Sequence, residues 1–228
     1  MTADNRAAAE QQTRRIHYFY DPVCGWCYGA TALIDKLHQR AQQQGWQLLL
    51  HPGGMIPRRA IDSSFRQHIL HADQRIGALT GMPFGQPYQQ RVASNDALVL
   101  DSMLPTQAIL TAKTLGLDDV RMLKAIQQAH YQHGLDISKE ETLQDIALQQ
   151  AQSAAISLTP TRWQAALASH DGLLQQTLQD SHQWMGQLGV QGFPTLLLET
   201  EQGWQRLDHS RYYGDPKGWQ EVLTTLIK

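Results

Sequence analysis

The hydrophobic positions near the N-terminus follow first a strand pattern and then a helical pattern. Residues 16–21 form a short run of aromatic residues and isoleucine that is typical of a β-strand. From Gly25 the apolar side chains recur at helical spacing, and Gly45 predicts the end of that helix because glycine readily forms a C-cap. Residues 47–51 predict a second strand, which a turn at residues 52–54 ends. A strand, a helix and a strand in this order predict two parallel strands.

The middle of the chain, residues 62–186, shows helical periodicity and little strand signal. Residues 82–87 are an exception and predict a loop, because they contain one glycine and two prolines. The predicted helix starts are marked by capping residues or an early proline, namely Asp62 or Ser63, Asp118 or Asp119, the capping-box pattern of residues 138–141, and Thr159 before Pro160. We therefore expect a block of helices.

The C-terminal part returns to a strand pattern. Residues 195–199 and 204–207 are rich in β-forming side chains and flank a turn at residues 201–203, so they predict a β-hairpin. Residues 217–226 predict a closing amphipathic helix. The order of elements is therefore βαβ, a block of helices, and ββα.

The composition argues against several classes of protein. With 19 basic and 21 acidic side chains in 228 residues, the formal net charge is −2, so a general nucleic-acid-binding surface is not expected. No apolar stretch reaches the roughly 20 residues of a membrane span, and the N-terminus lacks the apolar segment of a signal peptide. We therefore expect a soluble cytoplasmic protein without a membrane partner.

The chain contains two cysteines, Cys24 and Cys27, in a Cys-x-x-Cys pattern. They lie where the first predicted strand meets the predicted helix, and the unpaired N–H groups of a helix N-terminus favour a thiolate at Cys24. We predict a redox-active pair in which Cys24 attacks a disulfide and Cys27 resolves the product, while Gly25 and Trp26 tune the reduction potential. The alternatives are an inert buried pair or half of a metal site. Because no second such pair occurs, we expect no metal.

A second motif occupies residues 192–195, just before the third predicted strand. Pro194 at the start of a strand is allowed without any special role. A cis bond before Pro194 would turn the backbone of Phe193 outward beside Cys24, where a substrate peptide can pair with it as an added strand.

These motifs resemble the DsbA family of thioredoxin-fold proteins, and more narrowly its cytoplasmic FrnE-like branch of protein-disulfide isomerases. The residues that carry the resemblance are 21–29, 52–54, 81–84 and 190–195. The resemblance implies an α/β thioredoxin-like fold interrupted by a large all-helical insertion domain, as in DsbA. We assign residues 14–61 and 187–228 to the thioredoxin-like domain, residues 62–186 to the insertion, and residues 1–13 to a flexible tail.

The resemblance also implies roles for individual residues. Cys24 is the nucleophile, Cys27 is the resolving thiol and Pro194 is a cis-proline. We further predict that Phe193, Pro194 and Thr195 bind the substrate. No cofactor is expected beyond the redox-active disulfide, and glutathione is a candidate thiol partner. The implied partners are a disulfide-containing protein or small-molecule disulfide and a cellular thiol reductant.

Several alternatives stay open at this point. The same fold serves glutathione-linked transferases and isomerases, and a peptide-binding chaperone would use the helical insertion as its surface. His17 on the first strand is a candidate proton acceptor facing the cysteines, and residues 82–84 are a candidate loop over the site. Arg58 and Arg59 are candidate contacts for a glutathione carboxylate. For each of these residues, ordinary packing or a solvated loop is the simpler interpretation.

Overall fold

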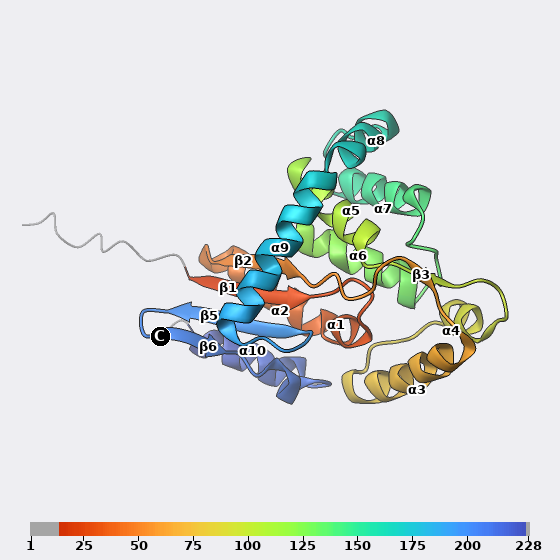
Figure 1. The fold of residues 1–228 in the computed structure, drawn as a ribbon. Helices are drawn as coiled ribbons and strands as arrows, with labels where there is room; N and C mark the ends of the chain where they lie inside the picture. Colours follow the sequence, from red (N-terminus) through yellow and green to blue (C-terminus); the bar gives the residue numbers. More distant parts are fainter. Residues whose placement is uncertain (1–13, 227–228) are drawn as a thin grey trace, which may run out of the picture.

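The computed structural model describes residues 14–226, so the predicted tail lies outside the described residues. A four-stranded sheet in the order β2-β1-β5-β6 occupies the centre (Figure 1). Its strands are β1 (Arg15–Tyr20), β2 (Gln47–Pro52), β5 (Thr195–Thr200) and β6 (Gly203–Arg206). β1 and β2 are parallel, as predicted, whereas β5 is antiparallel to β1 and to β6.

The connection between β1 and β2 contains two helices, α1 (Gly25–Gly29) and α2 (Thr31–Gln44), rather than the single helix predicted from Gly25. The interruption follows Gly29, a poor helix former. A Cβ at Gly29 would lie 2.7 Å from the Ile76 side chain, so close packing requires glycine there. The predicted C-cap is confirmed, because Gly45 has φ 66°.

In the described part of the chain, seven helices lie between β2 and β5 in sequence. They are α3 (Ser63–Thr80), α4 (Gln86–Ala93), α5 (Met103–Thr114), α6 (Asp119–Tyr131), α7 (Glu140–Ser153), α8 (Pro160–Ser169) and α9 (Asp171–Leu188). The predicted caps Asp62, Asp118 and Thr159 are confirmed, since each side chain accepts a hydrogen bond from an N–H in the first turn. A short antiparallel pair, β3 (Arg59–Ala60) and β4 (Val99–Leu100), was not predicted.

Two local predictions in this block were wrong. The predicted loop of residues 82–87 is shorter, because α4 begins at Gln86 and accommodates Pro87 in its first turn. The predicted capping box of residues 138–141 does not form. Lys139 is the N-cap residue of α7, and its side chain makes no capping hydrogen bond. The Ser138 hydroxyl instead donates to the Asp136 carboxylate at 2.7 Å.

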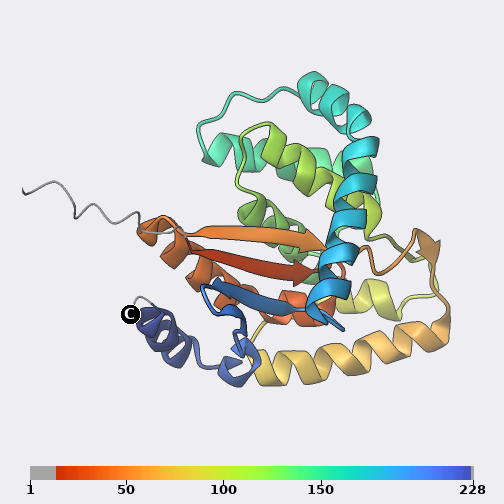
Figure 2. The same cartoon turned by 60° about the vertical axis from the view of Figure 1, so that its left-hand side comes forward.

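Helices cover both faces of the sheet (Figures 1 and 2). α9 crosses one face, whereas α2 and the C-terminal α10 (Pro216–Thr225) lie on the other. A short 3₁₀ helix, η1 (His209–Tyr212), precedes α10 in the chain. The Trp219 indole of α10 donates to the Leu33 carbonyl of α2 at 2.9 Å. α9 is continuous from the helical block to the sheet, so the assigned domain boundary at residue 187 falls in its last turn.

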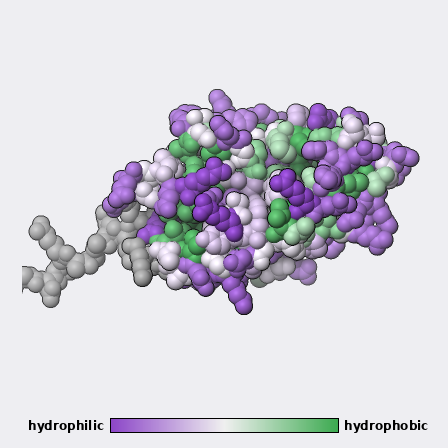
Figure 3. Space-filling model, turned by 90° about the horizontal axis from the view of Figure 1, so that it is seen from below, coloured by the Kyte–Doolittle hydropathy of each residue, from purple (hydrophilic) through white to green (hydrophobic). Residues whose placement is uncertain are grey.

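The residues of β1 alternate between these two layers. Ile16, Tyr18 and Tyr20 join the large core on the side of α1 and α2, whereas Phe19 packs with residues of α9. The face that α3 and α10 share shows several apolar patches separated by hydrophilic residues (Figure 3). Within the described residues, no helix has the length and apolar character needed to cross a membrane.

Candidate active site

Cys24 is the N-cap residue of α1, where the loop after β1 enters the helix. Its backbone is extended, with φ −83° and ψ 116°, so the residue stands just outside the first turn. Its side chain is 8% exposed, whereas Cys27, inside the helix, is fully buried. Both are free thiols. The structure therefore places the pair at the strand–helix junction that the sequence predicted.

The two thiols differ in how readily they ionise. A hydrogen bond from the Cys27 thiol lowers the pKa of Cys24, and the backbone N–H groups of Cys27 and Trp26 lower it further. Burial and the nearby charge of Asp21 oppose this decrease in the Cys24 pKa. Burial raises the pKa of Cys27 well above its ordinary value, and the hydrogen bond to Cys24 adds to that rise. Because the thiolate is the attacking form, the geometry favours Cys24 as the nucleophile.

The loop before β5 faces Cys24. The Phe193–Pro194 peptide bond is cis, as the resemblance implied. The Cys24 thiol donates to the Phe193 carbonyl oxygen at an S···O distance of 3.9 Å. Thr195 is buried, and its hydroxyl donates to the Gly192 carbonyl at 2.8 Å. The Phe193 backbone therefore borders the sulfur, whereas the Thr195 hydroxyl shapes the loop.

The turn after β2 fixes this loop from the side. A Cβ at Gly53 would lie 2.1 Å from the Phe193 ring, so the ring position requires glycine there. The Gly53 N–H donates to the Tyr20 carbonyl at 2.7 Å, and the Gly53 carbonyl oxygen lies 2.7 Å from Nε2 of His182 on α9. Residues from β1, the turn after β2, the loop before β5 and α9 thus meet around Gly53.

Gly25 and Trp26, the residues between the cysteines, lie beside the helical block and the C-terminal segment. A Cβ at Gly25 would lie 3.0 Å from the Asp73 carboxylate of α3, a group whose pKa burial raises to about 6. The Trp26 ring stacks on Tyr213 at a centroid distance of 5.8 Å, and the Arg75 guanidinium lies 5.8 Å from the same ring. Neither residue places a charge of its own near the sulfurs.

Asp21 is a member of the site that the residue-by-residue prediction did not single out. Its side chain is fully buried, and burial raises its pKa. Three donors partly offset that effect: the N–H groups of Met55 at 2.7 Å and Val23 at 3.0 Å, and the Ser102 hydroxyl at 2.9 Å. The Asp21 N–H also donates to the Cys27 sulfur at 3.5 Å. In the sequence, Asp21 is marked by its place three residues before Cys24 and as the first residue of the 21–29 motif.

His17 does not face the cysteines, so the suggestion that it is their proton acceptor is wrong. Its side chain is buried, and its ring lies among aromatic rings on the α9 side of the sheet, including Trp184 and Trp204. Its Nδ1 lies 2.9 Å from Nε2 of His51. Burial lowers the pKa of both histidines, to about 4 for His51. The alternation of side chains along β1 accounts for this placement.

The loop of residues 82–84 packs against α1. The Tyr28 hydroxyl donates to the Pro83 carbonyl, and the Phe84 ring meets the Tyr28 ring edge-on at 5.1 Å. The loop therefore contacts the helix that carries the cysteines through Tyr28.

Within residues 14–226, no three His, Cys, Asp or Glu side chains are grouped so that they could hold a metal ion.

The comparisons with known proteins agree with this geometry. The profile of the DsbA-like thioredoxin domain matches residues 15–213, most of the chain. The chain belongs to the DsbA-like thioredoxin family. This confirms the predicted fold class and the prediction of a thiol–disulfide oxidoreductase. Comparison with curated protein sequences gives no match.

Solved structures extend the comparison. The cytosolic disulfide reductase DsbM from Pseudomonas aeruginosa is 34% identical, with a TM-score of 0.81 over 93% of this chain and 98% of that protein. A second DsbM structure, with GSH, gives 34% identity and a TM-score of 0.79 over the same shares. A 2-hydroxychromene-2-carboxylate isomerase shares the fold at 14% identity and a TM-score of 0.52, over 93% of this chain and 98% of that protein.

Proposed function

We propose that this protein is a cytoplasmic, glutathione-coupled disulfide reductase in which Cys24 attacks the substrate and Cys27 resolves the mixed disulfide. The contrast between the thiols carries the proposal. Cys24 is slightly exposed, has a lowered pKa and borders the Phe193 carbonyl, whereas Cys27 is fully buried and has a raised pKa. The similarity to a cytosolic disulfide reductase supports the compartment and the direction.

The reaction follows as two exchanges. The Cys24 thiolate attacks one sulfur of the substrate disulfide, forms a mixed disulfide and releases the other substrate sulfur as a thiolate, which takes up a proton. Cys27 then loses its proton and attacks the Cys24 sulfur, which forms the Cys24–Cys27 disulfide and releases the second substrate thiol. The substrate gains two electrons and two protons, and the cysteine pair is oxidised.

Glutathione completes the cycle. One glutathione thiolate attacks the Cys24–Cys27 disulfide at Cys24, which leaves a mixed disulfide and a free Cys27 thiol. A second glutathione thiolate attacks the mixed disulfide, which releases oxidised glutathione and restores the Cys24 thiolate. The solved DsbM structure with GSH supports glutathione as this reductant. We assign Phe193 and Pro194 to substrate contact, because the Phe193 backbone borders the attacking sulfur.

Single-cysteine variants test this mechanism. We expect Cys24→Ser to lower kcat/KM for glutathione-dependent reduction of a protein disulfide by about 10³-fold or more, because it removes the nucleophile. Cys27→Ser is expected to accumulate a glutathione disulfide at Cys24, detected by mass spectrometry of the intact protein and its peptides. Retained activity in Cys24→Ser would contradict the assignment. So would normal turnover of Cys24→Ser with glutathione bound at Cys27.

A further inference from the structure

Ser102 links the helical block to the thiol centre. It lies directly before α5 and is fully buried. Its N–H donates to the Ile56 carbonyl at 2.8 Å, and its hydroxyl accepts from the Ile56 N–H at 3.0 Å. The same hydroxyl donates to the Asp21 carboxylate at 2.9 Å, across 81 residues of sequence. Ser102 therefore fixes both the segment after β2 and the carboxylate of Asp21, a residue whose own N–H donates to the Cys27 sulfur at 3.5 Å.

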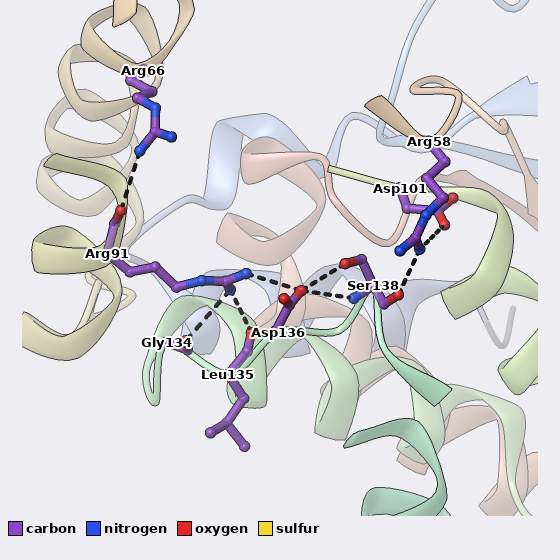
Figure 4. Close-up of polar contacts among 8 residues, drawn as sticks. All are labelled: Arg58, Arg66, Arg91, Asp101, Gly134, Leu135, Asp136 and Ser138. Carbon is purple, nitrogen blue, oxygen red and sulfur yellow. Dashed lines mark hydrogen bonds and ion pairs between the residues drawn. The ribbon is translucent and has the colours of Figure 1, made fainter. Parts of the chain in front are cut away.

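The residue before Ser102 is anchored by charge. The Asp101 carboxylate accepts from the Arg58 guanidinium at 3.2 Å (Figure 4). It also accepts from the Met103 N–H at 2.8 Å. Arg58 also donates to the Ser138 carbonyl at 2.6 Å, so this guanidinium is engaged within the protein. These contacts tie the position of Ser102 to the residue before β3, to the first turn of α5 and to the segment before α7.

The Asp21 carboxylate opposes negative charge on both sulfurs. Its charge raises the pKa of Cys24 and of Cys27. The charge of Asp101 in turn raises the pKa of Asp21, whereas the donors from Ser102, Met55 and Val23 favour the ionised form. Removing a donor therefore favours the neutral carboxyl, and a neutral carboxyl no longer disfavours the Cys24 thiolate.

We propose that Ser102 is a positioning residue that keeps the Cys24–Cys27 pair reducing by holding the Asp21 carboxylate against it. A stabilised thiolate stabilises the reduced form and makes a dithiol pair more oxidising, as in strongly oxidising relatives of thioredoxin. An ionised Asp21 acts in the opposite sense, which suits a reductase. The helical block thus contributes to the redox chemistry through one hydroxyl. This inference rests on the proposed redox cycle of the two cysteines.

A double-mutant cycle tests the inference on the full-length protein. The measurement is the equilibrium constant between the cysteine pair and reduced and oxidised glutathione, together with the pH midpoint of Cys24 alkylation. We expect Asp21→Asn to shift the equilibrium about tenfold toward the dithiol and Ser102→Ala about threefold, with both alkylation midpoints at lower pH. Because Ser102 acts through Asp21, the double variant should match Asp21→Asn.

Two further variants separate this role from a loss of stability. Thr111→Val removes a buried hydroxyl within α5, whose partner is His170 Nδ1 at 2.9 Å, and is expected to leave the equilibrium constant unchanged. Arg58→Gln removes the charged partner of Asp101, and the Arg58 side chain is 56% exposed. This variant should shift the equilibrium in the same direction as Ser102→Ala, by a smaller factor.

Two outcomes would overturn the inference about Ser102. An unchanged equilibrium constant in both Ser102→Ala and Arg58→Gln would overturn the inference. Additive effects of Ser102→Ala and Asp21→Asn would also overturn it, because Ser102 would then act by another route. These measurements read the thiol pair directly, so they remain interpretable if glutathione-dependent turnover of a protein disulfide proves absent and the proposed function fails.

Discussion

The two faces of the central sheet bury titratable side chains in opposite ways. On the α9 side, His17 and His51 are bonded mainly to each other among aromatic rings, and burial lowers the pKa of both. On the other side, Cys24 receives hydrogen bonds from a thiol and from N–H groups of α1, and its pKa is lowered toward the charged form. Burial alone suppresses ionisation, whereas burial with donors preserves a reactive charge.

The reactive face depends on close packing, so the largest effect is expected there. Gly53→Ala would place a methyl group inside the Phe193 ring position and move the loop that borders Cys24. Because displacement of about 1 Å at a reaction centre costs about 10²-fold, we expect kcat/KM to fall by that factor. Gly192→Ala, at a position where a Cβ meets only open space, is the matched control. Equal losses in the two variants would show that the Phe193 position is unimportant.

The α9 face should respond to acid instead. His51 has a pKa of about 4 in the folded protein and about 6.5 when unfolded, so the unfolded chain binds more protons between these values. Its contribution to stability is present above pH 6.5 and is lost as the pH falls toward 4. Allowing for its partial exposure, we expect a loss of about 2 kcal/mol from this group.

The measurement is the free energy of urea unfolding at pH 7 and pH 4.5, in the wild type and in His51→Gln. The variant should lose less stability on acidification than the wild type. The burial of Asp73, whose pKa is about 6, acts in the opposite direction in both proteins and cancels in the comparison. An equal loss in both proteins would contradict the neutral, buried state of His51.

The smallest effect is expected for His17 on catalysis. Since its ring lies on the α9 side, His17→Gln should change kcat/KM and the pH midpoint of Cys24 alkylation by no more than about twofold, an effect typical of a site without contact to the reaction. The free energy of unfolding of the His17→Gln variant should still fall, because the substitution disturbs the aromatic packing. A tenfold loss of turnover with normal stability would mean that the two faces communicate.

Much of the architecture was predictable because it depends on local signals. The β1–β2 pair and the caps at Gly45, Asp62 and Thr159 follow from period, glycine and side-chain oxygens within a few residues. The start of α4 was predicted too late because Pro87, which looked like a helix breaker, lies in its first turn. The error arose because the conformation of a proline depends on where the helix around it begins.

The site was predictable in part for the same reason. The Cys-x-x-Cys spacing at a strand–helix junction identified both thiols, and resemblance identified Pro194. The contact between Asp21 and Ser102 was not readable, because the two residues are 81 positions apart and nothing in either local sequence indicates it. His17 was misplaced because the sequence does not show which face of β1 turns toward the cysteines.

The most direct test of the central claim is the pH dependence of alkylation at each cysteine, mapped by peptide mass spectrometry on the reduced, native protein. We predict that Cys24 reacts first, with a midpoint below the roughly 8.5 of an ordinary thiol, and that Cys27 resists alkylation until much higher pH. A Cys24 midpoint at or above that ordinary value, or faster reaction of Cys27, would contradict the account.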